Sequence, residues 1–267
     1  NAARLDDGAY AEYILAKGDT QMHIPDGVTF EEAATLGVGI TTVGQALYQS
    51  LGLRLPGEQQ SASASAEEKT PVLIYGGSTA TGTLAIQFAK LSGYKVVTTC
   101  SPRNFDLVRS LGADAVFDYN DPNCAAEIRK FTADKLFYVL DCISTQSAGT
   151  ICANAIGPAG GKYSCLLSPS PDLSRDDVEN LCTIAYTAIG ESFSMLRRTF
   201  PAAPEDYEFQ KRFFALAEDL LREGKFKVHP LRVEGAGLKG VLDGMQLMRE
   251  DKVSGQKLVY RVAETPK

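Results

Sequence analysis

Short apolar runs alternate with helical patterns through the middle of the chain. The runs have the length and composition of strands buried on both faces of a parallel sheet. We expect six of them, at residues 72–75, 95–100, 115–119, 136–143, 162–167 and 183–189. Helical patterns separate them, at residues 84–91, 102–111, 123–132 and 147–156. This alternation predicts an α/β fold with a doubly wound parallel sheet of the Rossmann type.

The two ends of the chain do not continue the alternation, so we expect them to form a second lobe together. Residues 9–16, 226–233 and 257–262 are strand-like, and residues 207–223 and 238–249 are amphipathic and helical. A capping box, Thr29 with Glu32, opens a helix that Gly37, Gly39 and Gly44 are expected to divide. We place the domains at 1–38, 39–190 and 191–267. Residues 57–70, which lack large apolar side chains, are predicted to be a flexible loop.

Composition excludes several classes of protein. The 267 residues are 44% hydrophobic and 22% charged, with a formal net charge of -6, as in a soluble globular protein. The negative charge argues against a nucleic-acid or anionic-membrane partner, and no apolar run is long enough to span a bilayer. Six cysteines without a CxxC pair favour free thiols in a cytoplasmic protein, and two histidines predict no metal site. No pattern demands an oligomer, so we expect a monomer.

The stretch YGGSTATGTLAIQFAK, residues 75–90, joins the first predicted strand to the first predicted helix. A dinucleotide turn needs a sharp bend, a close approach of backbone to pyrophosphate and close packing of helix on strand. Gly76 and Gly77 suit the bend, and Gly82 suits the packing. Thr79 replaces the usual middle glycine, and we expect hydroxyls here to grip the anion beside the helix N-terminus. By itself the turn is equally compatible with a purely structural role.

The end of the second predicted strand indicates which nucleotide binds. NAD-binding proteins have a carboxylate here, which accepts a hydrogen bond from the 2′-hydroxyl of the ribose. This chain instead has Cys-Ser-Pro-Arg-Asn, residues 100–104, and the next carboxylate is Asp106. A guanidinium, a hydroxyl and an amide at a helix N-terminus suit a 2′-phosphate, so we predict NADPH. In the alternative, Ser101 only caps the helix and Arg103 lies in solvent.

Tyr119 ends the third predicted strand, at the carboxyl edge of the sheet where ligands bind. Its ring is placed to contact the adenine end of a nucleotide. A half-buried aromatic side chain with no ligand is an equally good interpretation of this position.

Several segments together resemble the medium-chain dehydrogenase/reductase superfamily, and within it the trans-acting enoyl reductases of fungal polyketide synthases. They are LGVGITTVGQAL, YGGSTATGTLAIQFAKLSGYKVVTTCSPRNFDLVRSLGADAVFDYN, GKFKVHPLRV and VSGQKLVYRV. The resemblance implies that the second lobe is a β-rich, GroES-like catalytic lobe. Only the tail of that lobe, near residues 1–26, precedes the nucleotide-binding part here. A lysine that the family uses for the cofactor phosphate would lie upstream.

The resemblance also implies residues for each part of the site. Cofactor contacts are expected from Gly76, Ser78, Thr79, Ala80 and Thr81 at the pyrophosphate, from Ser101, Pro102, Arg103 and Asn104 at the 2′-phosphate, from Tyr119 near the adenine ribose, and from Leu166, Leu167, Val253 and Ser254 around the nicotinamide. An acyl channel is expected along Gly39, Ile40, Thr41, Thr42, Thr187, Ala188, Ile189, Gly190 and Glu191. The leucines and Val253 are equally compatible with an ordinary core, and the two threonines with a helix cap.

The activity implied is NADPH-dependent reduction of the α,β-double bond of an acyl thioester on an acyl carrier protein. Hydride would reach the β-carbon, and the enolate would need a hydrogen-bond donor at its oxygen. Thr41, Thr42 or a backbone N–H is a candidate donor, and no side chain stands out as the proton donor. Two alternatives remain: a quinone or enone reductase of the same superfamily, and a non-catalytic NADP-binding partner of a synthase.

Overall fold

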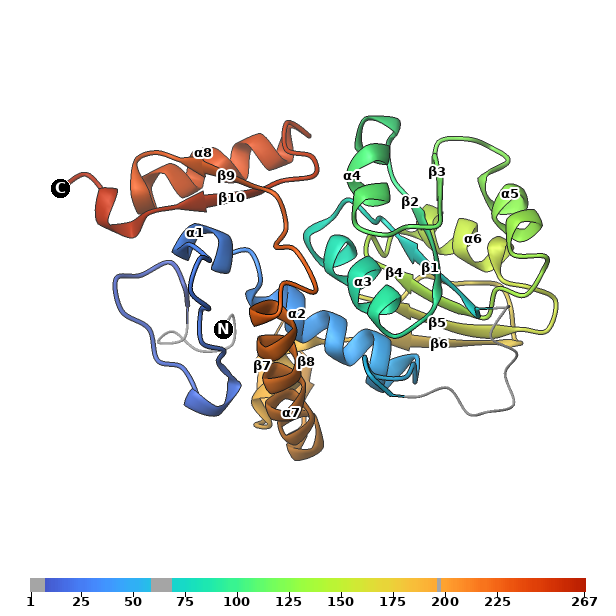
Figure 1. The fold of residues 1–267 in the computed structure, drawn as a ribbon, viewed down its shortest axis with the longest axis horizontal. Coiled ribbons are helices and arrows are strands. Elements are labelled where there is room, and N and C mark those ends of the chain that lie inside the picture. The colour runs from blue at the N-terminus through green and yellow to red at the C-terminus, as the bar shows by residue number, and fades with distance from the viewer. Residues whose placement is uncertain (1–7, 59–68, 196–197) are drawn as a thin grey trace. The chain divides into compact units, whose positions relative to one another are not determined.

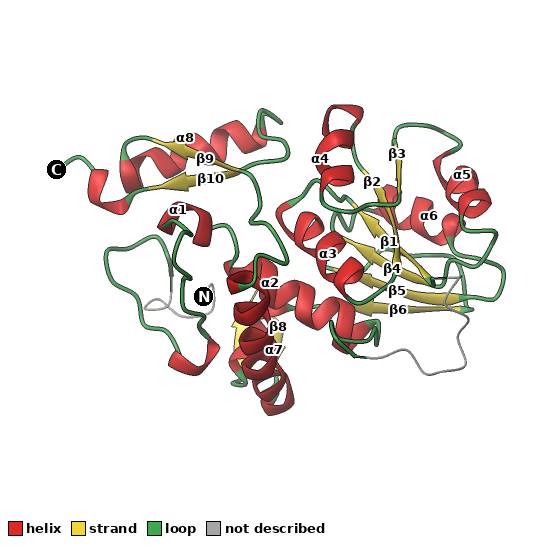
Figure 2. Ribbon diagram, in the orientation of Figure 1, coloured by secondary structure: helices red, strands yellow, loops and turns green. Residues whose placement is uncertain are grey.

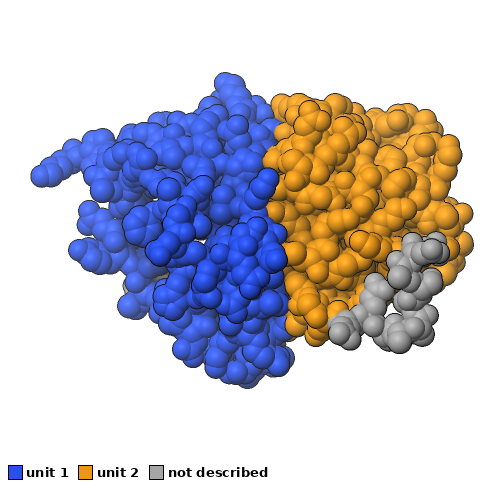
Figure 3. Space-filling view, in the orientation of Figure 1, with its two compact units in different colours: residues 1–41, 185–267 blue, residues 42–184 orange. Residues whose placement is uncertain are grey.

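The computed structural model describes residues 8–58, 69–195 and 198–267, and the chain divides into two compact units (Figure 3). Unit 1 consists of residues 1–41 and 185–267, and unit 2 of residues 42–184. Most of the predicted loop at 57–70 falls at residues 59–68, which lie outside the described residues.

Unit 2 is built on a parallel sheet whose strands follow the spatial order β3-β2-β1-β4-β5-β6 (Figures 1 and 2). The strands are β1 (Pro71–Tyr75), β2 (Lys95–Thr99), β3 (Ala115–Phe117), β4 (Tyr138–Asp141), β5 (Gly161–Cys165) and β6 (Val178–Cys182). This is the strand order of the dinucleotide-binding fold, in which ligands bind at the carboxyl ends where the order reverses between β1 and β4. The predicted doubly wound parallel sheet is therefore confirmed.

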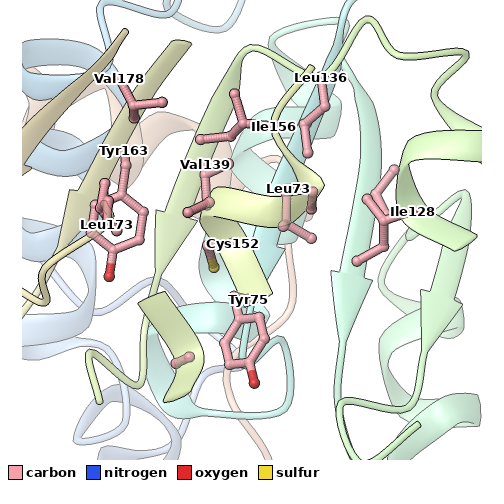
Figure 4. Packing of buried hydrophobic residues seen from close by; sticks show 14 of the residues in the cluster. Leu73, Tyr75, Ile128, Leu136, Val139, Cys152, Ile156, Tyr163, Leu173 and Val178 are labelled. Atoms are coloured by element: carbon pink, nitrogen blue, oxygen red, sulfur yellow. The ribbon is translucent and has the colours of Figure 1, made fainter. Parts of the chain in front are cut away.

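Helices cross between the strands of unit 2 and bury the apolar faces of the sheet. They are α3 (Ala80–Leu91), α4 (Phe105–Ser110) after the short η4 (Pro102–Asn104), α5 (Cys124–Phe131) and α6 (Gln146–Ala155). Helices α5 and α6 pack against each other. Ile128 and Cys152 from these helices form one core with Leu73, Val139 and Tyr163 from the strands (Figure 4). Each of these five side chains is fully buried, so the strand ends that carry the site are held rigidly.

The sixth strand was placed wrongly by the sequence. It runs from Val178 to Cys182, and residues 185–189 form the 3-10 helix η5 (Ala185–Ile189) of unit 1 instead. Among the strands of the described residues, β6 pairs only with β5, so it lies at the edge of the sheet and exposes Glu179 and Asn180. An edge strand needs no continuous apolar run, so β6 gave no strand signal in the sequence. The apolar residues at 184–189 have the composition of a buried strand although most of them form η5.

Unit 1 combines both ends of the chain. Its elements are η2 (Gly18–Thr20), α1 (Phe30–Ala33), most of α2 (Gly37–Val43), β7 (Phe193–Met195), β8 (Arg198–Phe200), α7 (Pro204–Arg222), β9 (Leu231–Glu234), α8 (Gly237–Arg249), β10 (Lys257–Tyr260) and η6 (Val262–Glu264). Strands β9 and β10 are parallel neighbours joined through α8. The predicted helices at 207–223 and 238–249 are confirmed.

Two predicted strands of unit 1 differ from the structure. The segment 226–233 pairs only from Leu231 onwards, because Pro230 just before it has no N–H to donate to a ladder. The segment 9–16 is not a strand, and no strand in the described residues pairs with it. Tyr10 and Tyr13, which suggested a half-buried strand, are 76% and 90% exposed.

The capping box is confirmed: the Thr29 hydroxyl accepts from the N–H of Glu32 at 3.2 Å, and the Glu32 carboxylate accepts from the N–H of Thr29 at 2.9 Å. The helix that it opens ends before Gly37 rather than at the glycines. From Gly37 onwards the backbone stays helical through α2 and the π-helix η3 (Gly44–Ser50). All six cysteines are free, as predicted.

Candidate dinucleotide-binding site

The turn between β1 and α3 depends on three glycines. Gly76 has φ +79°, and a Cβ there would lie 2.8 Å from Ile143 Cγ1. A Cβ on Gly77 would overlap the Thr98 hydroxyl, and one on Gly82 would overlap the carbonyl oxygen of Gly76 and lie 2.8 Å from Gly77 Cα. The predicted roles of Gly76 and Gly77 in the bend and of Gly82 in helix packing follow directly from this geometry. The glycines therefore let the backbone of the turn pack closely against the start of α3.

The Thr79 hydroxyl is already occupied, in contrast to its predicted role as an anion donor. It donates to the carbonyl oxygen of Gly76 at 2.8 Å and accepts from the N–H of Gly82 at 2.9 Å, so Thr79 is the N-cap of α3. The backbone N–H groups of Ala80 and Thr81 follow in the first turn, where a helix leaves its N–H groups without intrahelical partners. A pyrophosphate at this turn would therefore meet mainly backbone N–H groups, with the partly exposed Ser78 beside them.

Strand β2 holds this turn at the carboxyl edge of the sheet. The Thr99 hydroxyl accepts a hydrogen bond from the N–H of Gly76 at 3.1 Å. The Thr99 carbonyl oxygen accepts one from the N–H of Gly77 at 2.8 Å. The Thr98 hydroxyl donates to the carbonyl oxygen of Ile74 at 2.6 Å. These bonds place the start of α3 next to the residues that follow β2.

The residues after β2 meet the end of β3. The Ser101 hydroxyl lies 3.1 Å from the Tyr119 hydroxyl and makes no side-chain cap bond to η4, unlike in the alternative in which it only caps a helix. Arg103 is exposed, as that alternative expects, and Asn104 is buried, at 9% exposure. Tyr119 is 39% exposed, and its ring centroid lies 6.4 Å from that of Tyr75. The predicted residues of the adenosine end thus lie together.

Residues 100–105, directly after β2, contain no carboxylate. Asp106 points into solvent and lies 3.7 Å from Arg109. The Asp118 carboxylate, after β3, accepts two hydrogen bonds from Asn120, one from its backbone N–H and one from its side-chain amide, both at 2.9 Å. Burial, with a smaller contribution from Asp118, raises the pKa of Cys100 to about 11, so this thiol at the end of β2 stays neutral.

The ends of β4 and β5 are joined by a buried network that the sequence analysis missed. Asp141 is fully buried and accepts from the N–H of Ile143 at 2.8 Å, from the N–H of Ser144 at 2.9 Å and from the Tyr163 hydroxyl at 2.7 Å. The Ser144 hydroxyl in turn accepts from the N–H of Leu166 at 2.8 Å. Burial raises the pKa of Asp141, and the three hydrogen bonds oppose that shift. The available signal was a carboxylate directly after a buried strand.

This network fixes the backbone of the predicted nicotinamide residues. Leu166 is partly buried, and Leu167 is 60% exposed. The carbonyl oxygen of Leu167 accepts from the Cys165 thiol at 3.2 Å and from the Cys182 thiol at 3.3 Å. An exposed leucine anchored at its backbone is suited to contact a flat ring, and it is not an ordinary core residue.

Val253, Ser254 and most of the predicted acyl-channel residues belong to unit 1. Val253 and Ser254 lie between α8 and β10 and are partly buried. Thr41 ends the first segment of unit 1, and Thr42, at 7% exposure, begins unit 2. Ile40 is fully buried and lines a pocket of about 420 Å³ together with Phe30, Phe214 and other residues of unit 1.

Within unit 1, helix α7 contacts both predicted acyl-channel segments. Its Gln210 side chain donates to the Thr41 hydroxyl at 3.0 Å. A Cβ on Gly190, which has φ +74°, would lie 2.8 Å from Tyr207 Cβ. Lys17 fixes the second segment further, because its Nζ lies 2.6 Å from the Glu191 carboxylate and 2.8 Å from the carbonyl oxygen of residue 189. Gln210 carried no signal in the sequence.

Comparison with known proteins identifies the family. Residues 80–174 match the zinc-binding dehydrogenase family model. A trans-enoyl reductase of Alternaria alternata is 48% identical over 96% of this chain and 72% of its own length, and one of Aspergillus sclerotiorum is 46% identical over 98% and 76%. The chain belongs to the fungal trans-enoyl reductases. It is also 57% identical to a dual trans-enoyl reductase/FAD-dependent monooxygenase of Aspergillus terreus over 86% of this chain, but spans only 32% of that protein.

Solved structures agree on the fold of this trans-enoyl reductase. The CurK enoyl reductase matches with a TM-score of 0.67 at 20% identity, over 88% of this chain and 65% of its own. An NAD-dependent alcohol dehydrogenase matches with a TM-score of 0.69 at 22% identity, over 94% and 64%. These neighbours confirm the medium-chain dehydrogenase/reductase fold, with a Rossmann sheet and part of a GroES-like lobe. As a trans-enoyl reductase the protein is an oxidoreductase, and the fold of this family implies a nicotinamide cofactor.

His229 is buried at 1% exposure, and burial, together with Lys257, lowers its pKa to about 4. It is therefore neutral near pH 7, as expected of a structural histidine.

Within residues 8–58, 69–195 and 198–267, no three His, Cys, Asp or Glu side chains lie together in a way that could hold a metal ion. No helix of the described chain is long and apolar enough to cross a bilayer.

Proposed function

We propose that this trans-enoyl reductase uses NADPH to reduce the α,β-double bond of an acyl thioester carried by the acyl carrier protein of a polyketide synthase. The protein acts in trans, as a monomer that visits the synthase. The names of its relatives support the reaction class, and the chain's own residues support the choice of cofactor.

The observation that carries the proposal is the cluster after β2. The exposed Arg103 and the paired hydroxyls of Ser101 and Tyr119 lie at this end of the sheet, and no carboxylate follows β2 before Asp106. A guanidinium binds phosphate through two parallel charge-assisted hydrogen bonds, which a ribose hydroxyl cannot reproduce. This end of the site therefore recognises the 2′-phosphate through Ser101, Pro102, Arg103 and Asn104.

The remaining residues bind and orient the two reactants. The bend at Gly76 and Gly77, held close to α3 because Gly82 has no side chain, brings backbone near a pyrophosphate bound at the N-terminus of α3. Leu166, Leu167, Val253 and Ser254 contact the nicotinamide. When bound, NADPH supplies the hydride for the β-carbon. The acyl chain lies along residues 39–42 and 187–191, which exclude water and orient the thioester.

A titration tests the cofactor assignment. The purified protein is titrated with NADPH and NADH, following cofactor fluorescence, and Arg103→Ala is compared with Arg109→Ala. Loss of a charge-assisted contact of about 1.5–3 kcal/mol should weaken NADPH binding about 10- to 100-fold in Arg103→Ala and leave NADH unchanged. Arg109 is the matched control because it is an exposed arginine on α4, directly after η4, and pairs with Asp106.

Turnover tests the reaction. NADPH oxidation with the crotonyl thioester of N-acetylcysteamine should exceed oxidation with a simple quinone or enone. Faster reduction of the quinone would favour a quinone reductase, and NADPH binding with no turnover of any acceptor would favour a non-catalytic synthase partner. Equal affinity for NADPH and NADH would refute the 2′-phosphate site.

A further inference from the structure

Helix α7 carries a buried amide, Gln210, which bonds to a predicted substrate residue and to no other side chain of the described residues. Gln210 is 1% exposed, and its Nε2 donates to Thr41 Oγ1 at 3.0 Å. Its Oε1 is buried and has no hydrogen-bond partner among the described residues. A buried glutamine with one unsatisfied atom costs free energy, so its retention beside Thr41 calls for a role at that hydroxyl.

The orientation of the amide decides what Thr41 can do. With Nε2 directed at Thr41, the hydroxyl oxygen accepts and its proton remains to be donated elsewhere. Within the described chain the Thr41 side chain makes no other hydrogen bond. Turning the amide round would bury an NH₂ group with no acceptor, and orphaned buried N–H groups are rarer than under-satisfied carbonyl oxygens. The structure therefore presents Thr41 as a hydrogen-bond donor.

The neighbouring threonine is less suited to this role. Thr42 is 7% exposed and already has an interaction partner, whereas Thr41 is partly exposed. Gln210 lies on the 19-residue helix α7, next to Phe213 and Phe214, which are 2% and 9% exposed. A side chain held on a well-packed helix keeps its geometry, which is what a positioning residue requires.

We propose that Gln210 is a positioning residue that fixes the Thr41 hydroxyl as the donor to the thioester oxygen. This rests on the proposed function. Hydride forms a bond to the β-carbon. The π electrons of the α,β-double bond then form a double bond between the α-carbon and the carbonyl carbon, and the π electrons of the carbonyl move onto its oxygen. Thr41 keeps its proton and stabilises this oxygen by a hydrogen bond. Water then protonates the α-carbon, and the pair on oxygen restores the carbonyl.

Kinetics of single and double variants test the proposal, with NADPH and the crotonyl thioester of N-acetylcysteamine as probes. Thr41→Val should lower kcat about 100-fold, as loss of an enolate donor does. Gln210→Met, which fills the same volume without an amide, should lower kcat about 10-fold with the Kd of NADPH unchanged. The double variant should be no slower than Thr41→Val alone, because Gln210 acts only through Thr41. The control is Gln246→Met, at an exposed position of α8, and its kcat should match that of wild type.

Gln210→Glu gives a second, independent readout. An ionised carboxylate would accept the Thr41 proton and remove the donor, whereas a protonated one would donate as the amide does. The kcat of this variant should therefore rise relative to wild type as pH falls.

Multiplicative losses in the double variant, or a pH profile of Gln210→Glu parallel to that of wild type, would overturn the proposal. A wild-type protein that does not oxidise NADPH with the thioester would instead refute the proposed function, so the two failures are distinguishable.

Discussion

Removing the Tyr163 hydroxyl should destabilise unit 2 in a pH-dependent way. Tyr163 is fully buried and donates to the buried Asp141 carboxylate at 2.7 Å. Burial, and then Asp141 itself, raises the pKa of Tyr163 far above its usual value, so the phenol remains a donor at any working pH. In Tyr163→Phe the ring still fills its site and only the hydrogen bond is lost. A bond to a charged group contributes about 1.5–3 kcal/mol, and this is the expected loss of unfolding free energy near pH 8.

The pH dependence follows from the Asp141 pKa. Its folded pKa lies above the unfolded value because of burial, so its stabilising contribution is present below the unfolded pKa and is lost as pH rises through the folded one. The Tyr163 hydroxyl reduces this loss of stability because its hydrogen bond stabilises the ionised form of Asp141. The penalty of Tyr163→Phe should therefore shrink as pH falls through the folded pKa of Asp141, because a protonated carboxyl no longer needs the donor.

Urea unfolding followed by far-UV circular dichroism measures this, since the chain has no tryptophan. Tyr138→Phe is the control, because Tyr138 lies on the neighbouring β4 and is only partly buried. It should change stability by less than about 0.5 kcal/mol. A Tyr163→Phe effect as small as that of the control, or one that does not vary with pH, would refute the reasoning.

Three further predictions concern single positions. Thr79→Val removes the N-cap of α3 and should cost about 1 kcal/mol in urea unfolding, whereas Thr81→Val should cost much less; equal losses would contradict the cap. Gly82→Ala forces a Cβ onto the Gly76 carbonyl and should cost about 1–3 kcal/mol and weaken NADPH binding in the same titration; unchanged affinity would argue against a pyrophosphate bound at this turn. His229 has a pKa of about 4 in the folded state against 6.5 unfolded, so up to about 3 kcal/mol of stability should be lost as pH falls between these values. Denaturation of His229→Gln at several pH values should lack this loss.

The sequence alone determined the nucleotide-binding sheet and the position of its turn. Five of the six predicted strands overlap strands of the structure, because strands buried on both faces are continuous apolar runs that local sequence reveals. Gly76, Gly77 and Gly82 could be assigned because their demands are local: a positive φ at one, and no room for a Cβ at the others. The absence of a carboxylate after β2 was likewise visible in five consecutive residues.

Only the tertiary structure decided which groups meet. The edge strand β6 pairs on one side, so its residues carried too little apolar signal to be found. The Thr79 hydroxyl turned out to cap α3, because its partners Gly76 and Gly82 approach only when helix and strand pack closely. Asp141 with Tyr163 and Thr41 with Gln210 are 22 and 169 residues apart in sequence. Such pairs depend on packing between distant elements, which residue patterns along the chain do not encode.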